Sequence, residues 1–198
     1  MLAELTQIQT SELPLEALRA HLRLGTGFSD VALQDPILES SLRAAVAAIE
    51  ARTGKVILSR GFRWTVSAWR CPEAQALPMA PVVALMDFAL YSSAQEQFPI
   101  SADQLVLIED TQRPQLKSRI GELPRIPIGG RAEITFLAGF GTTWDDIPAD
   151  LAHAVMLLAA HYYEIRHEHP MNDGNMPFGV TSLIEKYRTV RILGGAVA

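Results

Sequence analysis

The chain has 198 residues, of which 48% are hydrophobic and 20% are charged, and its formal net charge is −5 at pH 7. This is the composition of a globular protein rather than a disordered one, and the length allows one sizeable core and a small second unit. The negative charge and the dispersed basic residues argue against a protein that grips nucleic acid through its phosphates. The single cysteine, Cys71, excludes an internal disulfide framework and fits a reducing compartment.

The N-terminal residues show no basic start followed by an apolar run, so the sequence predicts no signal peptide. No apolar segment approaches the roughly 20 residues that a membrane span requires. We therefore expect no membrane partner.

Two helices are predicted in the N-terminal part of the chain. The first covers residues 14–24 and ends at the glycines that follow. The second covers residues 36–52, with Asp35 as its N-cap, Pro36 at the first helical position and Gly54 as its left-handed C-terminal residue. Apolar residues of the second helix recur with the spacing of a half-buried helix.

Between residues 55 and 141 the hydrophobic period changes to two, which is typical of strands. Prolines interrupt this region repeatedly and favour turns and edge strands over a helix. The sequence therefore predicts an antiparallel sheet or small sandwich. The strands are expected at residues 62–68, 82–91, 105–108, 115–120 and 131–138.

Two more helices are predicted after this block. Residues 148–167 carry a strong helical period, and a fourth helix is expected from Ser182 to about residue 191, where Ser182 and Glu185 have capping-box spacing. The fold class is thus α+β, a small bundle of about four helices with a β-rich block inserted between the second and third. The expected parts are residues 1–54, 55–141 and 142–192, followed by a tail at 193–198.

Polar residues that could carry chemistry are few. His153 and His161 are two helical turns apart, too far to share one metal ion easily, and a polar helix end is the better interpretation of the His167-Glu168-His169 run. Asp145 and Asp146 precede a helix, where carboxylates more often cap than catalyse. No motif predicts a catalytic residue, a metal or a cofactor.

Two features of the β-rich block have both a binding and a structural interpretation. Gly139 and Gly141 match no phosphate-binding motif and are better explained by a sharp strand exit that needs positive φ. Phe62, Trp64 and Trp69 could form a stacking surface for sugars or bases, but alternating aromatic residues in a strand more often belong to the core.

The amino-acid sequence resembles that of one protein family over most of its length. The segment GRAEITFLAGFG, an IPADL helix start and LLAAHYYEIR are similar to the head–tail connector (adaptor, or head-completion) proteins of tailed bacteriophages and gene transfer agents. Other segments resemble the same family in the same order. They are LEALRAHLRL, LRAAVAAIEARTGKVILSRGF, LPMAPVVAL and PFGVTSLIEKYRTVRI.

The resemblance implies a structural protein without enzymatic activity, located in the virion or phage-like particle and assembled in the host bacterial cytoplasm. Such proteins form a ring, typically a dodecamer, beneath the portal protein, and they dock a stopper or tail-completion protein. DNA passes through the ring lumen without sequence-specific binding, which suits a mildly acidic chain.

The resemblance also implies functional surfaces. The C-terminal segment is expected to bind the portal. Helix faces that carry both charge signs either contribute to a heterologous contact between subunits or are simply solvated. The predicted portal-binding residues are Tyr187, Arg188, Val190, Arg191, Ile192, Leu193, Gly194, Gly195, Ala196, Val197 and Ala198. The predicted subunit-interface residues are Glu164, Arg166, Glu185 and Lys186.

Two functions from other classes stay open at this point. A carbohydrate-binding β-sandwich module would expose Phe62, Trp64 and Trp69 on a monomer. A small metal-dependent hydrolase would bring His153, His161 and the Asp145–Asp146 pair together in one cleft.

Overall fold

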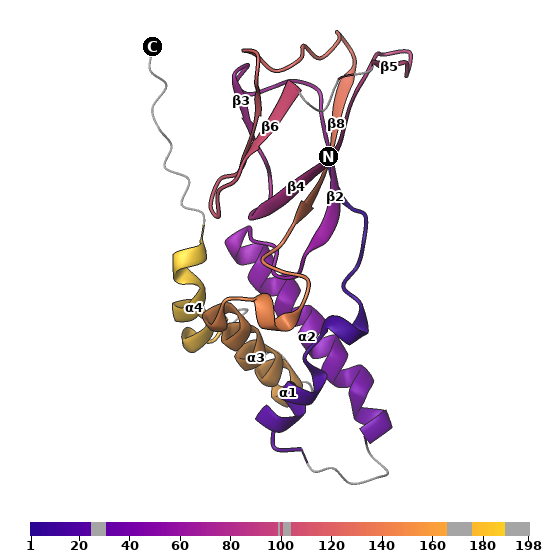
Figure 1. Ribbon diagram of the computed structural model, residues 1–198. Helices are drawn as coiled ribbons and strands as arrows, with labels where there is room; N and C mark the ends of the chain where they lie inside the picture. The colour runs from indigo at the N-terminus through magenta and orange to yellow at the C-terminus, as the bar shows by residue number, and fades with distance from the viewer. Residues whose placement is uncertain (25–30, 99, 101–103, 166–175, 189–198) are drawn as a thin grey trace.

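The computed structural model describes residues 1–24, 31–98, 100, 104–165 and 176–188. The molecule is elongated, with the helices gathered at one end and the strands at the other (Figure 1). None of the described helices is long and apolar enough to cross a membrane.

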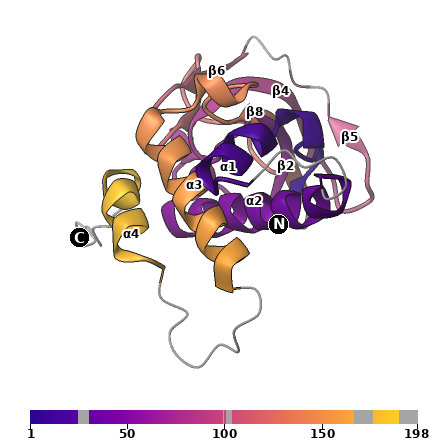
Figure 2. The same ribbon diagram turned by 90° about the horizontal axis from the view of Figure 1, so that it is seen from below.

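Among the described residues, the helical end contains four helices and the 3₁₀ turns η1, η3 and η5. Helices α2 and α3 pack against each other, α1 contacts both, and α4 lies against the outer side of α3 (Figure 2). The helices are α1 (Leu15–His21), α2 (Val31–Thr53), α3 (Ala149–Glu164) and α4 (Phe178–Ile184). The 3₁₀ turns are η1 (Thr10–Glu12), η3 (Trp144–Asp146) and η5 (Glu185–Tyr187).

The core of this end is formed by the apolar stripes of the helices. Leu42 and Ile49 on α2 face Leu151 and Leu158 on α3, and all four side chains are almost completely removed from water. Fully burying one leucine-sized side chain stabilises the fold by about 1.5–3 kcal/mol. The packing of α2 against α3 is therefore the main support of the helical end.

The strands form two antiparallel sheets. The larger has the order β1-β2-β8-β4-β5 and the smaller has the order β3-β7-β6. The strands of the larger sheet are β1 (Leu2–Glu4), β2 (Arg60–Val66), β4 (Val82–Tyr91), β5 (Gln97–Phe98) and β8 (Arg131–Ala138). Those of the smaller sheet are β3 (Ala74–Ala76), β6 (Leu105–Ile108) and β7 (Gln115–Ser118).

Strand β8 is the centre of the larger sheet and pairs with β2 on one side and β4 on the other. Its residues alternate between buried and half-buried, so that Ile134 and Phe136 enter a second core. Phe136 lies opposite Phe62 of β2, and the two rings stack with centroids 5.9 Å apart. Cross-strand aromatic pairs of this kind are typical stabilisers of antiparallel sheets.

Most of the predicted fold is confirmed. The α+β class, the four helices and the β block between the second and third of them are present, and three predicted strands have the expected bounds: β4, β6 and β8. The strand expected at residues 62–68 is β2, which begins and ends two residues earlier, and the strand expected at 115–120 ends at Ser118. Three short strands were not predicted: β1, β3 and β5.

The predicted start of the second helix was wrong. Helix α2 begins at Val31, which places Pro36 inside it, and Asp35 is not an N-cap. The Asp35 carboxylate instead forms an ion pair with Arg19 of α1. This contact ties α1 to α2, and tertiary packing of this kind overrides a local capping preference.

The predicted start of the fourth helix was also wrong. Helix α4 begins at Phe178, after Pro177, and Ser182 lies inside it rather than at its N-cap. Val180 and Ile184, which are four positions apart and buried, set the helical period one turn earlier than the capping-box spacing implied. The Thr181 hydroxyl donates to the Pro177 carbonyl oxygen at 3.3 Å.

Candidate assembly surfaces

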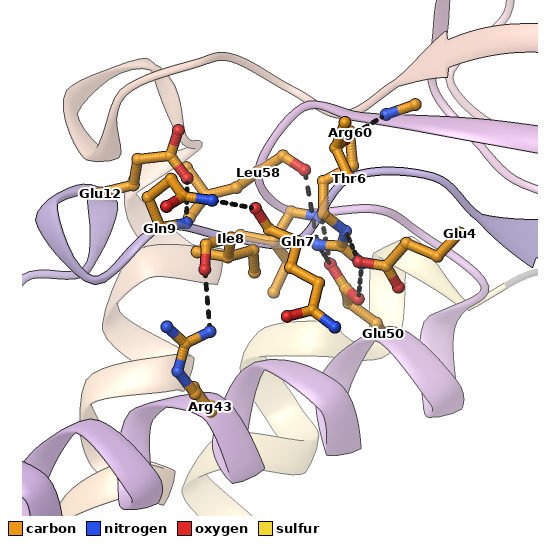
Figure 3. Close-up of polar contacts among 12 residues, drawn as sticks. Glu4, Thr6, Gln7, Ile8, Gln9, Glu12, Arg43, Glu50, Leu58 and Arg60 are labelled. Carbon is orange, nitrogen blue, oxygen red and sulfur yellow. Dashed lines mark hydrogen bonds and ion pairs between the residues drawn. The ribbon is translucent and has the colours of Figure 1, made fainter.

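A buried ion network lies where the helical end meets the larger sheet. Arg60, the first residue of β2, donates two hydrogen bonds to the Glu50 carboxylate of α2, at 2.7 and 3.1 Å (Figure 3). Its Nε lies 2.8 Å from Glu4 Oε1 of β1, an ion pair without an aligned hydrogen bond. Burial alone would lower the pKa of Arg60, but Glu50 and Glu4 outweigh it and raise the pKa above its usual value. Three distant segments are thus joined by one guanidinium group.

The N-terminal segment is also fastened along α2. Arg43 donates to the Ile8 carbonyl oxygen at 2.9 Å (Figure 3). It also pairs with Glu39 at 2.7 Å. Thr10 donates to the same Glu39 carboxylate at 2.9 Å. These contacts hold residues 8–10 against the helical end and leave the chain before them to reach the edge of the sheet.

A second contact between the two ends involves Lys55, which is fully buried. Its ammonium group donates to the Gln112 side chain, in the turn between β6 and β7, at 2.8 Å. Burial lowers the pKa of Lys55, and the nearby Asp110 carboxylate acts in the opposite direction. The amide group of Gln112 continues the chain of contacts by donating to the Lys186 carbonyl oxygen at 3.3 Å.

The last described turn, η5, is held by side chains from three other segments. We call this set the C-terminal clasp: Tyr187 and Lys186 with Asp150, Phe140 and Gln112. The Tyr187 hydroxyl donates to Asp150 at 2.7 Å, and the Lys186 ammonium lies 2.6 Å from the other oxygen of the same carboxylate. The Tyr187 ring packs edge-on against Phe140, with centroids 5.9 Å apart.

The contacts of the clasp shift the pKa values of Asp150 and Tyr187. Burial would raise the pKa of Asp150, but the bonds from Lys186 and Tyr187 outweigh it and hold the pKa below its usual value. Burial, together with the bond to Asp150, raises the pKa of Tyr187. The turn is therefore fixed by charge as well as by packing.

Several residues that were predicted to bind the portal or a neighbouring subunit make contacts within their own subunit. Lys186 and Tyr187 are engaged by Asp150, and Glu185 forms an ion pair with Arg188 at 3.0 Å. Glu164 is exposed near the end of α3. The other predicted residues lie outside the described residues: Arg166, Val190, Arg191, Ile192, Leu193, Gly194, Gly195, Ala196, Val197 and Ala198.

Sequence reasoning missed the partners that hold η5. Asp150 belongs to the helix start that carries the family resemblance, but its partners lie 36 and 37 positions later, and no spacing rule connects them. Gln112 lies in a turn that had no assigned role. Only the fold brings these residues together.

Some large apolar side chains are also exposed without having been predicted. Phe178 at the start of α4 is 87% exposed, and Ile120 and Ile128 in the connection between β7 and β8 are 78% and 93% exposed. No periodic pattern singles out these positions in the sequence. Single exposed apolar side chains are common on protein surfaces, and these three face solvent in the isolated subunit.

The aromatic residues of β2 and Trp69, which follows it, do not form the exposed surface that a carbohydrate-binding module would need. Phe62 is buried, and Trp64 and Trp69 are half-buried against the same core. Trp69 stacks on Phe88 with centroids 6.2 Å apart, and its indole N–H donates to the Pro124 carbonyl oxygen at 2.9 Å. These contacts support the structural interpretation of all three aromatic residues.

Two residues of the hydrolase hypothesis, His153 and Asp146, have an exposed and a capping position, respectively. His153 is exposed on α3, and Asp146 forms a capping box with Thr143, whose N–H and hydroxyl donate to it at 3.0 and 2.8 Å. These bonds lower the pKa of Asp146. In the part of the chain that the structure describes, no three His, Cys, Asp or Glu side chains lie together as a metal site would require.

The backbone geometry after β8 requires glycine at two positions. Gly139 has a φ of +143°, and a Cβ atom there would lie 2.4 Å from the Ser59 Cα atom. At Gly141 a Cβ atom would lie 2.0 Å from the Asp146 side chain. The expectation of a sharp strand exit is confirmed for Gly139, whereas Gly141 is needed for close approach.

Solved structures of gene transfer agent (GTA) particles contain chains that are similar to this one along almost its whole length. In the neck of an empty GTA particle computed with C6 symmetry, the similar chain is 50% identical, with a TM-score of 0.89 and 98% of each chain covered. In the virion of a native GTA particle the identity is 50% and the TM-score is 0.86, and in the neck of a native particle computed with C12 symmetry they are 47% and 0.83. Both of these matches also cover 98% of each chain.

The sequence matches no family model and no curated protein. The structural matches nevertheless combine high identity, nearly complete coverage of both chains and the same fold. They agree with the family resemblance of the sequence. The chain therefore belongs to the head–tail connector family and is a structural adaptor of the neck of a gene transfer agent or phage-like particle.

Proposed function

We propose that twelve copies of this protein form a ring that continues the DNA channel beneath a portal and docks a stopper or tail protein. The observation that carries this proposal is the 47–50% identity, over 98% of the chain, to chains in particle necks computed with C6 and C12 symmetry. A twelvefold ring has both symmetries. The contact between neighbouring copies in such a ring is heterologous, so two different faces of each subunit take part.

The role that follows is structural and needs no enzymatic activity or cofactor. The net charge of −5 suits a channel through which DNA slides, because a basic lumen would bind the phosphates too strongly. The particle would assemble in the cytoplasm of its bacterial host.

In this proposal the portal-binding segment begins at Tyr187. Tyr187 and the preceding Lys186 are engaged by Asp150, so the clasp fixes the point from which the segment leaves the subunit. The sequence from Val190 to Ala198 is apolar apart from Arg191. Such a segment gains stability by ordering in a groove between portal subunits.

The charged residues at this end of the molecule have a second proposed role. Glu164, Arg166, Glu185 and Lys186 contribute to the contact with the neighbouring subunit. Because Glu185 and Lys186 already have partners within the chain, their contribution comes from exchanging or sharing these partners.

Imaging of the purified protein with its portal tests the proposal. Negative-stain class averages of the mixture should show a ring beneath the portal, and no association with an intact portal would overturn the proposal. Deletion of residues 193–198 should weaken docking while leaving the far-UV circular dichroism spectrum unchanged. A matched control is Ile128→Ser, a change in an exposed loop of the β block that should leave portal docking intact.

A further inference from the structure

A groove of about 480 Å³ lies beside the C-terminal clasp. It is formed where the start of β4, the turn between β6 and β7 and the exit of β8 meet. Val83 and Phe140 contribute apolar surface, and Val83 is 50% exposed. Glu109 and Asp110 place two carboxylates at the same groove.

The acidic side of the groove is built into the turn. Asp110 accepts hydrogen bonds from the backbone N–H groups of Gln112 and Arg113, at 2.6 and 2.7 Å. These bonds lower the pKa of Asp110, which favours its charged form. The groove thus combines an apolar surface with negative charge, a combination suited to an apolar segment that carries a cation.

The chain leaves the clasp next to this groove. Phe140 lines the groove and also packs on Tyr187, and Gln112, next to the groove residue Thr111, donates to the Lys186 carbonyl oxygen. An extended chain advances about 3.3–3.6 Å per residue, so three residues beyond Arg188 extend roughly 10 Å. The groove is therefore within reach of the residues that follow the clasp.

The sequence after Arg188 has the chemistry that the groove would accept. It reads Thr189-Val190-Arg191-Ile192-Leu193, one cation between apolar side chains. We propose that residues 190–193 occupy the groove of their own subunit before assembly, with Arg191 facing Glu109 and Asp110. Portal binding then displaces the segment from the groove. This inference rests on the proposed function for the displacement step, because the same segment is proposed to bind the portal.

Occupation of the groove by residues 190–193 has a practical role in assembly. A segment that is covered by its own subunit presents less apolar surface to other copies before the portal is available. Docking then exchanges one apolar environment for another, and the net free energy of portal binding is smaller than the contacts alone would supply.

Disulfide trapping tests the placement directly. The only cysteine, Cys71, is exposed and is first replaced by serine. In that background, Val83→Cys with Ile192→Cys should form an intramolecular disulfide on mild oxidation, seen as faster migration at monomer mass on a non-reducing gel. Ile128→Cys with Ile192→Cys is the matched control and should not form one. Absence of the Val83–Ile192 disulfide, or a covalent dimer in its place, would overturn the proposal.

Two further measurements distinguish the groove assignment from the proposed docking to the portal. Glu109→Lys should lower the yield of the intramolecular disulfide by about twofold to fivefold, the effect expected for a surface ion pair. An unchanged yield would refute the role of the acidic side. Adding the portal before oxidation should suppress the disulfide. If the disulfide forms in the free protein but the portal neither binds nor suppresses it, the groove assignment stands and the proposed docking function fails.

Discussion

Removal of the Glu50 carboxylate tests the buried network at the junction of the helices and the larger sheet. In Glu50→Ala, Arg60 keeps only Glu4 as a charged partner, although its own side chain is 7% exposed. The Ile57 backbone N–H also loses its acceptor, which lies at 2.8 Å in the native chain. Breaking a buried ion pair from one side costs about 3–5 kcal/mol, because the remaining charge stays buried without compensation.

The matched control is Glu4→Ala. The Glu4 side chain is 42% exposed, so water replaces much of its contact with Arg60, and the expected loss is at most about 1 kcal/mol. For a chain of this size, 1 kcal/mol corresponds to about 2–4 °C in Tm. Thermal unfolding followed by circular dichroism should therefore show a decrease of at least about 6 °C for Glu50→Ala and no more than about 4 °C for Glu4→Ala.

A double variant checks the physical cause. Glu50→Leu with Arg60→Met removes both charges, so it should be more stable than Glu50→Ala, with incomplete recovery because Ile57 still lacks its acceptor. The reasoning is refuted if Glu50→Ala lowers Tm no more than Glu4→Ala does. It also fails if the double variant is the least stable of the three.

Three further perturbations have expected outcomes. Gly139→Ala should lower the free energy of unfolding by at least about 1–3 kcal/mol in urea titration, because of the positive φ and the contact with Ser59; an unchanged midpoint would refute this. Asp150 is charged above its unfolded-state pKa of about 3.9, and its lower folded-state pKa stabilises the native chain there. That contribution is lost as the pH falls through the folded pKa, so Asp150→Asn should flatten the dependence of Tm on pH between about pH 2 and 6, and an unchanged slope would contradict the clasp. Phe178→Ser should leave the free energy of unfolding of the isolated subunit within about 0.5 kcal/mol of the native value, since the ring faces solvent; a larger loss in urea titration would show that Phe178 packs within the subunit.

The sequence predicted elements whose stability is largely local or strongly periodic. Strand β8 alternates cleanly because one of its faces is buried, and α3 carries a continuous apolar stripe. In both cases the hydrophobic period reflects which side chains are buried, and it therefore indicates whether the segment is a strand or a helix.

The errors have a different origin. The N-terminal strand β1 has three residues and exists because residues 62–64 of β2 pair with it, and nothing in its own composition shows this. Asp35 carries a good capping signal but is used by Arg19 of another helix. Where a residue has both a local and a distant partner, the distant one is invisible in the sequence.

The candidate assembly surfaces were likewise predictable only in part from the sequence. The prediction that the C-terminal segment is a contact region followed from the family resemblance, whereas the clasp that anchors it depends on Asp150, Phe140 and Gln112 from three separate segments. The groove beside it is likewise formed by segments far apart in the chain. Composition and spacing carry no information on such convergence.

The central position of β8 has a consequence for synthesis of the protein. Residues of β2 pair with residues of β8 that are between 66 and 78 positions later, and α2 packs against α3, which begins 96 positions after α2 ends. Neither core can therefore close until most of the chain has left the ribosome, and pairing at such separation is slow. We expect a truncated translation product to lack both cores, so that only complete subunits have the surfaces needed to enter a ring.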